Sequence, residues 1–198
     1  MLRSASVLFS IGATLGSALD AIHTHSGATT YPRPIFLKMA WWTPGIFGFA
    51  GLSTGLAYAV TERLTGKSIT RDVGPAEAAA GFAAFTGLYA ITGFLPASNA
   101  TKLAIVGAGA AGLLAALAPT REAAALAATT AVVGPAVEVF LVSRGAFSHA
   151  GKDFLGIPMW LPALYAAGSV AFGVVGKLIA AELDPAPAPA AEPATSAG

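Results

Sequence analysis

Long apolar stretches alternate with short polar ones along the chain. The apolar stretches run over about residues 5–22, 36–60, 75–95, 102–118, 122–142 and 157–181. Each is long enough to cross the roughly 30 Å hydrocarbon core of a bilayer as one α-helix. The polar segments between them carry most of the charge, together with the Pro, Gly, Ser and Asn residues that end helices. The pattern predicts an all-α polytopic membrane protein, a bundle of six transmembrane helices whose neighbours are antiparallel.

Composition agrees with a membrane protein and argues against other classes. Of the 198 residues, 55% are hydrophobic and only 11% are charged, whereas soluble domains carry roughly 25% charged residues. The net charge is +1 and basic residues do not cluster with aromatic ones, so we expect no nucleic-acid partner. The chain has no cysteine, which excludes disulfides and thiolate metal sites.

The two ends of the chain need separate interpretation. The opening segment MLRSASVLFSIGATLGSALDA has the charge and apolar run of a secretory signal, but its cleavage pattern is imperfect and we expect it to remain as the first helix. The Pro/Ala-rich residues 183–198 predict a disordered tail, so the transmembrane domain covers residues 1–182. Arg63, Lys67 and Arg71 share one short loop, which favours cytoplasmic termini.

Three glycine motifs predict close helix packing. The stretch GAGAAG, Gly107 to Gly112, matches the dinucleotide-binding fingerprint, but it lies inside an apolar span where no strand turns into a helix. Small residues at such spacing let helix backbones approach closely in lipid. GATLG, from Gly12, and GLSTG, from Gly51, have the same spacing and the same expected role.

Polar residues give little sign of catalysis or metal binding. His23 and His25 are expected in the first loop and His149 in the last, as solvated side chains. Without a third convergent donor we predict no metal site and no cofactor. No Gly-x-Ser-x-Gly or His-Glu-x-x-His motif is present, so we expect no enzyme activity.

Glu138 is the ionisable residue placed most deeply in an apolar span. Pro135, one turn earlier, removes a backbone donor and frees the carbonyl near Ala131, which predicts a bend and a polar notch. Glu138 then either faces a cavity or forms a hydrogen bond to a neighbouring helix, and both interpretations stay open. Asp20, by contrast, lies near a span end, where we expect its side chain to reach the interface. The three tryptophans suit interfacial anchoring.

Three longer segments resemble one family over roughly residues 3–182. They are AWWTPGIFGFAGLSTGLAY, FTGLYA and GAFSHAGKDFLGIPMWLPALYAAG, whose combined order and spacing are similar to the Insig proteins, the sterol sensors of animal endoplasmic reticulum, and to their bacterial homologues. The resemblance implies six transmembrane helices, cytoplasmic termini, no catalysis and a lipid-binding cavity open toward the membrane. Animal members hold an oxysterol, and bacterial members are expected to hold a glycerolipid such as diacylglycerol.

Individual residues of this sequence also match positions of the family's motifs. Phe85 and Gly87 match a cavity-facing segment, and Glu138 and Val139 fall where animal members have a Gln. The segment LAPTRE replaces the animal motif whose Asp binds a partner, so we expect no animal-type escort protein. Lys102 stands near a sterol-lining Gln of the family, which argues against animal-type sterol selectivity. The Ala- and Gly-rich, cysteine-free composition suggests a bacterial member in the cell membrane.

Together these observations predict a non-enzymatic, lipid-sensing protein that holds one amphipathic lipid, diacylglycerol or sterol-like, in an intramembrane cavity. The expected lipid-binding residues are Trp42, Phe85, Tyr89, Pro135, Glu138 and Phe140. A homo-oligomer, for example a trimer, is expected as a further association. Two alternatives remain: a small transporter or proton-coupled carrier using Glu138, against which the halves show no alignable repeat, and a ligand-free membrane assembly protein using its glycine faces.

Overall fold

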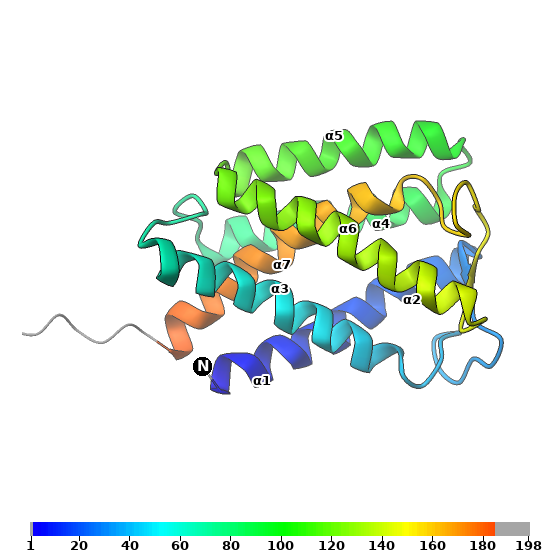
Figure 1. The fold of residues 1–198 in the computed structure, drawn as a ribbon, viewed down its shortest axis with the longest axis horizontal. Helices are drawn as coiled ribbons and strands as arrows, with labels where there is room; N and C mark the ends of the chain where they lie inside the picture. The colour runs from blue at the N-terminus through cyan, green and yellow to red at the C-terminus, as the bar shows by residue number, and fades with distance from the viewer. Residues whose placement is uncertain (1, 185–198) are drawn as a thin grey trace, which may run out of the picture.

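A computed structural model describes residues 2–184 of the chain as a bundle of long helices (Figure 1). The helices are α1 (Leu2–Ile11), the π-helix η1 (Gly12–Gly16), α2 (Ser17–Ser26), α3 (Thr43–Thr65), α4 (Pro75–Phe94), α5 (Asn99–Leu117), α6 (Arg121–Ser143) and α7 (Leu161–Leu183). Two short strands, β1 (Thr29–Thr30) and β2 (Ser148–His149), pair antiparallel. Because α1, η1 and α2 follow one another without a break, these elements form six rods.

The six rods confirm the predicted all-α membrane bundle. Among the described residues, four rods are long and apolar enough to span a membrane by length and composition: Leu2–Ser26, Asn99–Leu117, Arg121–Ser143 and Leu161–Leu183. The second and last rods begin later than expected, at Thr43 and Leu161, because Pro44 and Pro162 occupy their first turns and the residues before them form tight turns. The expected disordered tail lies, from residue 185 onward, outside the described residues.

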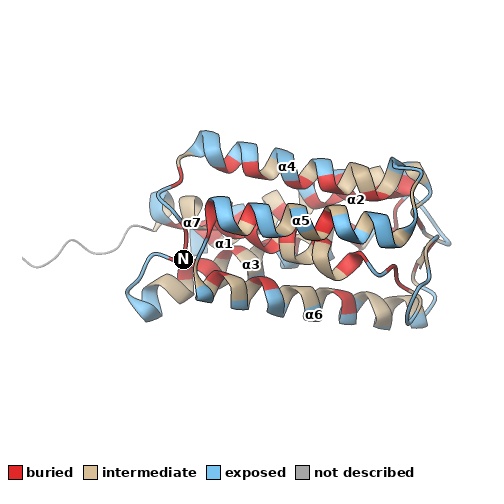
Figure 2. Cartoon of the chain, turned by 90° about the horizontal axis from the view of Figure 1, so that it is seen from above, coloured by how far each residue is buried: buried red, intermediate tan, exposed pale blue. Residues whose placement is uncertain are grey.

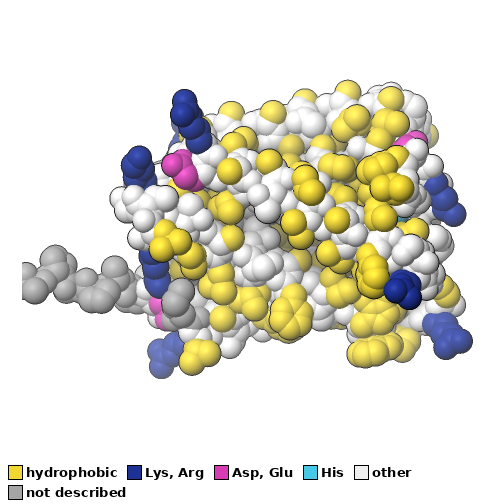
Figure 3. Space-filling model, in the orientation of Figure 1, with side chains coloured by type: hydrophobic (Ala, Val, Ile, Leu, Met, Phe, Trp, Pro, Cys, Tyr) yellow, Lys and Arg dark blue, Asp and Glu magenta, His cyan; other side chains and the backbone are white. Residues whose placement is uncertain are grey.

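The two ends of the bundle differ in what they hold. Both ends of the described chain lie at one end, which we call the terminal end, where the Ser4 hydroxyl donates to the Asp184 carboxylate. The long connections 27–42 and 144–160 lie at the other, the loop end (Figure 1). On the face seen in Figure 3, charged side chains gather at these two ends and leave an uncharged band between them. Such a band is what a bilayer requires.

Helix α7 is the central rod. Half of its most apolar 18-residue window is buried, compared with 11% of the corresponding window of α6. It packs against α3, α4, α5 and α6, whereas α3 and α6 scarcely touch each other. Buried residues accordingly face inward between the helices, and the outward faces are exposed (Figure 2).

Two of the three glycine motifs make the predicted close contacts. A Cβ at Gly12 would lie 2.4 Å from the Phe47 carbonyl oxygen, and a Cβ at Gly51 would lie 2.7 Å from Gly12 Cα. Gly55, in the same motif, meets Gly176 of α7 backbone to backbone. In GAGAAG the packing explanation holds for one glycine only: Gly109 seats Leu88, while a Cβ at Gly107 or Gly112 would meet nothing within 4 Å. That motif lies within the continuous helix α5, which rules out a dinucleotide-binding turn.

The expectation that the two halves contain no alignable repeat was wrong. Residues 16–47 align without a gap to residues 134–165, and the identical pairs are Gly16/Gly134, Ala18/Ala136, Gly27/Gly145, Ala28/Ala146, Phe36/Phe154, Leu37/Leu155, Trp42/Trp160 and Pro44/Pro162. Both copies run from a helix through a loop into the next helix. The identities are sparse, so they become convincing only when the two copies share a backbone conformation.

The backbone of the two copies agrees at several unusual places. Leu37 and Leu155 have φ values of 48° and 49°, a left-handed conformation that branched side chains rarely adopt. A narrow turn encloses each of them, bridged from Phe36 to Met39 in the first copy and from Phe154 to Ile157 in the second. The repeat-equivalent residues Thr30 and Ser148 are paired across β1 and β2. The two loops are therefore related by a local two-fold axis that passes near this pair.

The glycine contacts lead to a first prediction. In Gly176→Ala the added Cβ would lie 2.3 Å from Gly55 Cα, so α3 and α7 must part and the free energy of unfolding should fall by about 1–3 kcal/mol. Gly87→Ala is the control because a Cβ there meets nothing within 4 Å, and it should leave stability unchanged or raise it by up to about 1 kcal/mol through helix propensity. Thermal unfolding in detergent measures both. Equal melting temperatures would contradict the assigned backbone contact.

Candidate functional site

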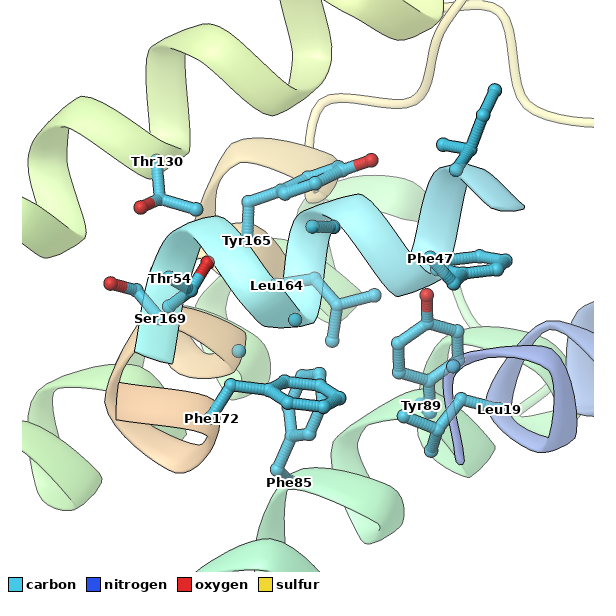
Figure 4. A pocket seen from close by; sticks show the side chains of 15 residues that line it. Leu19, Phe47, Thr54, Phe85, Tyr89, Thr130, Leu164, Tyr165, Ser169 and Phe172 are labelled. Carbon is cyan, nitrogen blue, oxygen red and sulfur yellow. The ribbon is translucent and has the colours of Figure 1, made fainter. Parts of the chain in front are cut away.

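An apolar cavity of about 100 Å³ lies inside the bundle (Figure 4). Its lining comes from η1 and from helices α2, α3, α4, α6 and α7: Gly16, Leu19, Ile46, Phe47, Ala50, Gly51, Thr54, Phe85, Tyr89, Thr130, Leu164, Tyr165, Gly168, Ser169 and Phe172. In Figure 4 the rings of Phe85 and Phe172 lie together on one side, and Tyr89 points toward Phe47. Most of this wall is hydrocarbon, so the cavity suits an apolar occupant.

Glycines position three of the aromatic rings in this wall. Phe47 packs on Gly16, Tyr165 packs on Gly134, and Phe85 packs on Gly168. At Gly134 a Cβ would lie 2.2 Å from the Tyr165 ring, so no other residue permits that ring position. The sequence therefore fixes the ring positions through small residues on facing helices.

A second, polar cavity of about 50 Å³ adjoins the first toward the loop end. The two share four lining residues: Ile46, Phe47, Tyr89 and Tyr165. The polar cavity is further lined by Asp20, His23, Thr29, Tyr31, Trp42, Thr43, Val137, Glu138, Leu141, Phe147, His149 and Leu161. An apolar cavity and a polar cavity thus lie side by side, and an amphipathic molecule has the same division into an apolar and a polar part.

Glu138 lies on the wall of the polar cavity with both carboxylate oxygens engaged. The Tyr165 hydroxyl donates to Oε1 at 2.6 Å, and His149 Nε2 donates to Oε2 at 2.7 Å. The sequence left open whether Glu138 faces a cavity or forms a hydrogen bond to a neighbouring helix. In the structure its carboxyl does both. These two hydrogen bonds compensate for the desolvation of the carboxyl.

Asp20 is the functional-site residue that the sequence interpretation missed. It was expected to reach the interface, but it is 5% exposed and its Oδ2 accepts a hydrogen bond from the Tyr31 hydroxyl at 2.9 Å. Burial, and secondarily the charge of Asp20, raise the pKa of Tyr31 well above its ordinary value. Tyr31 therefore stays a protonated donor to Asp20.

Two of the three histidines are buried, which corrects the expectation of solvated loop residues. His23 belongs to α2, is 3% exposed, and stacks on the Tyr89 ring with centroids 4.4 Å apart. Its Nε2 lies 2.8 Å from the Thr92 hydroxyl, which itself donates to the Tyr89 carbonyl, so His23 is the donor. His149 is 4% exposed, and His25 alone is exposed. Among residues 2–184, no group of three or more His, Cys, Asp or Glu side chains is placed to hold a metal ion.

The chain is similar to known proteins both in sequence and in fold. No protein-family profile matches the chain. Insulin-induced gene 1 protein from Homo sapiens is 27% identical over 184 residues, which cover 91% of this chain and 66% of the human protein. The chain thus spans slightly less than two thirds of that relative. The protein of the same name from Xenopus tropicalis is also 27% identical, with 91% of this chain and 73% of the relative covered.

Solved structures agree over almost the whole chain. A cross-linked trimer of MvINS superposes with a TM-score of 0.81 at 29% identity, covering 92% of this chain and 97% of that one. MvINS, a mycobacterial Insig homologue from Mycobacterium vanbaalenii, gives a TM-score of 0.80 at 28% identity over the same shares of the two chains. The chain resembles the Insig family in both sequence and fold. The resemblance that the three sequence segments indicated is confirmed.

The six residues predicted for the site fall into two groups. Phe85 lines the apolar cavity, Trp42 and Glu138 line the polar one, and Tyr89 lines both. Pro135 and Phe140 line neither cavity. Helix α6 is continuous through Pro135.

Surface position accounts for two further differences from expectation. Phe140 is 56% exposed, with the Arg144 guanidinium 5.2 Å from its ring centre, so it faces away from the cavities. Trp41 is 74% exposed, as an interfacial anchor should be, but Trp160 is 3% exposed and donates from its indole nitrogen to Asn99. Trp160 is therefore a packed residue of the loop end and not an interfacial anchor.

The hydrogen bonds at Glu138 give a second prediction. Tyr165→Phe removes one donor from a half-buried carboxylate and should lower the free energy of unfolding by about 1–3 kcal/mol. Tyr58→Phe is the matched control, because the buried Tyr58 hydroxyl has no hydrogen-bond partner and its loss should be neutral or stabilising. Unfolding in detergent at neutral pH compares the two. If both changes cost the same, the Tyr165 contact does not hold the carboxyl.

Proposed function

We propose that this Insig-like protein is a non-enzymatic lipid sensor that holds one amphipathic lipid in the two neighbouring cavities. The observation that carries the proposal is that an apolar cavity and a polar one lie next to each other inside the bundle and share four lining residues. An acyl or ring-bearing hydrophobic part would occupy the apolar cavity, and the polar end would meet the hydrogen-bonding groups around Glu138. Diacylglycerol and sterols both have this division.

The lipid would reach the cavities from the side, between α3 and α6. Both helices pack on α7 but scarcely on each other, and each contributes to the cavity wall. Ile46 on α3 and Val133 and Val137 on α6 expose apolar side chains to the membrane along this line. The cavity volume accommodates only part of a lipid, so the remainder of the hydrophobic tail would lie in the groove between these helices.

Sensing requires that the lipid bind two arrangements of the bundle unequally. A lipid that enters between α3 and α6 moves these helices relative to α7, and the surfaces of α3 and α6 would then differ between the empty and filled protein. A partner that reads either surface would respond to lipid level. We propose this as the regulatory output, in agreement with the regulatory character of the Insig family.

Self-association and membrane placement belong to the same proposal. MvINS forms a cross-linked trimer in its solved structure, which supports a homo-oligomer, and a trimer in particular, for this chain. Likeness to a mycobacterial homologue supports a bacterial cell membrane. Arg63, Lys67 and Arg71 at the terminal end support cytoplasmic termini.

A proton-coupled carrier is the second candidate, because the internal repeat and the buried Glu138 are features that carriers share. The continuous helix α6 speaks against it, since carriers usually break helices at the transport site. If the protein in liposomes shows a flux of solutes or protons, and this flux disappears in Glu138→Gln, the protein is a carrier and the lipid-sensor proposal is wrong.

Filling the apolar cavity tests the proposed function directly. Ala50→Phe adds a ring to the cavity wall and should lower the lipid bound per protein several-fold, because the ring occupies the space of the hydrophobic tail. Ser53→Phe is the control on the same helix: both residues are exposed, but Ser53 does not line the cavity. Lipid extraction of the purified proteins with mass spectrometry measures both. An undiminished lipid complement in Ala50→Phe would contradict this location.

A further inference from the structure

The two carboxyl groups of the polar cavity are equivalent in the internal repeat. Asp20 aligns with Glu138, and their hydrogen-bond donors Tyr31 and His149 align with each other. In each copy a glycine lies one helical turn before the carboxyl, and an aromatic ring from the next helix of that copy packs on this glycine. The pairs are Gly16 with Phe47 and Gly134 with Tyr165. The local two-fold arrangement thus brings two matching acidic arms to one cavity.

One difference between the two copies leaves one arm open. Tyr165 has a hydroxyl that donates to Glu138, whereas its counterpart Phe47 has none. Glu138 therefore accepts a hydrogen bond at both oxygens, and Asp20 accepts one from Tyr31 at Oδ2 only. Within residues 2–184, Asp20 Oδ1 receives no hydrogen bond, although its residue is 5% exposed.

Two donors on the same wall are also unused. The Thr43 residue is 2% exposed, and its hydroxyl lies near Tyr31 but completes no hydrogen bond. The Tyr89 hydroxyl also has no hydrogen bond among the described residues, and Figure 4 shows it pointing toward Phe47, which lines both cavities. A buried polar group without a partner costs roughly 1–3 kcal/mol, so an occupant that satisfies these groups would gain affinity.

The unused groups match one hydroxyl. A hydroxyl donates one hydrogen bond, which Asp20 Oδ1 can accept, and it accepts others, which Tyr89 and Thr43 can donate. The polar cavity of about 50 Å³ has space for an alcohol-sized group. A phosphate is larger, carries negative charge and offers mainly acceptors, so it would lie unfavourably against two carboxyls.

We propose that Asp20 and Glu138 make the polar cavity selective for lipids that end in an uncharged hydroxyl and exclude lipids that end in a phosphate. This inference rests on the proposed lipid binding and adds the head-group chemistry to it. Asp20 is the group that the hydroxyl contacts. Glu138, closed by Tyr165 and His149, supplies the second carboxyl of the cavity wall. Diacylglycerols and sterols meet the requirement alike, and phosphatidic acid fails it.

The test needs three probes on the full-length wild-type protein in detergent: dioleoylglycerol, its O-methyl ether and dioleoylphosphatidic acid. Native mass spectrometry or competition for the bound lipid gives the relative affinities. We expect the alcohol to bind at least about tenfold more tightly than the ether, which has lost the donated hydrogen bond, and than the phosphatidic acid. This comparison requires no variant, so it does not depend on the folding of one.

Variants then assign the selectivity to the two carboxyls. Asp20→Asn should weaken binding of the alcohol about tenfold, because a charge-assisted acceptor is lost. Both Asp20→Asn and Glu138→Gln should raise the affinity for phosphatidic acid relative to the alcohol. Glu77→Gln, an exposed carboxyl at the terminal end of α4, is the matched control and should change neither ratio.

The outcomes separate this inference from the proposed function. If none of the three probes binds to wild-type protein, the lipid site itself is wrong and this inference falls with it. If all three bind equally well, or if the ratios are the same in Asp20→Asn and Glu77→Gln, the protein binds lipid but the head-group assignment is overturned.

Discussion

A carboxyl inside an apolar bundle must find hydrogen-bond donors, and this requirement organises the loop end of the protein. Neither Asp20 nor Glu138 has a charged partner on its own helix; the donors Tyr31 and His149 come from the long connections. The connections therefore place Tyr31 and His149 back against the bundle, while residues 32–38 and 152–155 of the same connections stay exposed. Pairing of β1 with β2 and the left-handed glycines Gly27 and Gly145 make that return possible. The polar cavity is the space enclosed by this arrangement.

Close packing elsewhere leaves the apolar cavity unfilled. Where α1 and η1 meet α3, and where α3 meets α7, glycines bring backbones together, and the helices cannot shift toward the cavity without separating there. On the other sides Phe85, Phe47 and Tyr165 are each seated on a glycine, which holds their rings at the wall. Backbone contacts and ring positions together fix an opening that side-chain collapse would otherwise close.

Sequence reasoning succeeded where the signal was local. Six apolar runs predicted six rods, and the glycine spacing in GATLG and GLSTG predicted that backbones approach closely at these motifs, because in lipid both properties depend on neighbouring residues alone. It failed where burial depended on distant segments. His149 is a loop residue in sequence, and only the pairing of β2 with β1 places it against Glu138. Phe140 was favoured for its aromatic side chain near Glu138, but the helical turn directs it outward.

The internal repeat would have corrected the largest omission. Asp20 looks like an end-of-helix carboxylate until it is aligned with Glu138. The alignment is hard to detect because the shared residues are chiefly Gly, Ala, Phe, Leu, Trp and Pro, which are common in membrane helices and their ends. These residues matter because each occupies a special position: a left-handed turn, a glycine on which an aromatic ring packs, or the first turn of a helix.

A two-fold scaffold offers two equal acidic arms, whereas an amphipathic lipid has one polar end. The symmetry must therefore be broken if one group is to receive that end in a defined orientation. The equivalent positions Tyr165 and Phe47 differ by one hydroxyl, and this small difference breaks the symmetry. Both rings still pack on the equivalent glycine of their own copy. The hydroxyl of Tyr165 closes Glu138, and its absence from Phe47 leaves Asp20 open. The Tyr165 hydroxyl thus distinguishes a closed carboxyl from an open one, in a pair whose side chains also differ by one methylene group.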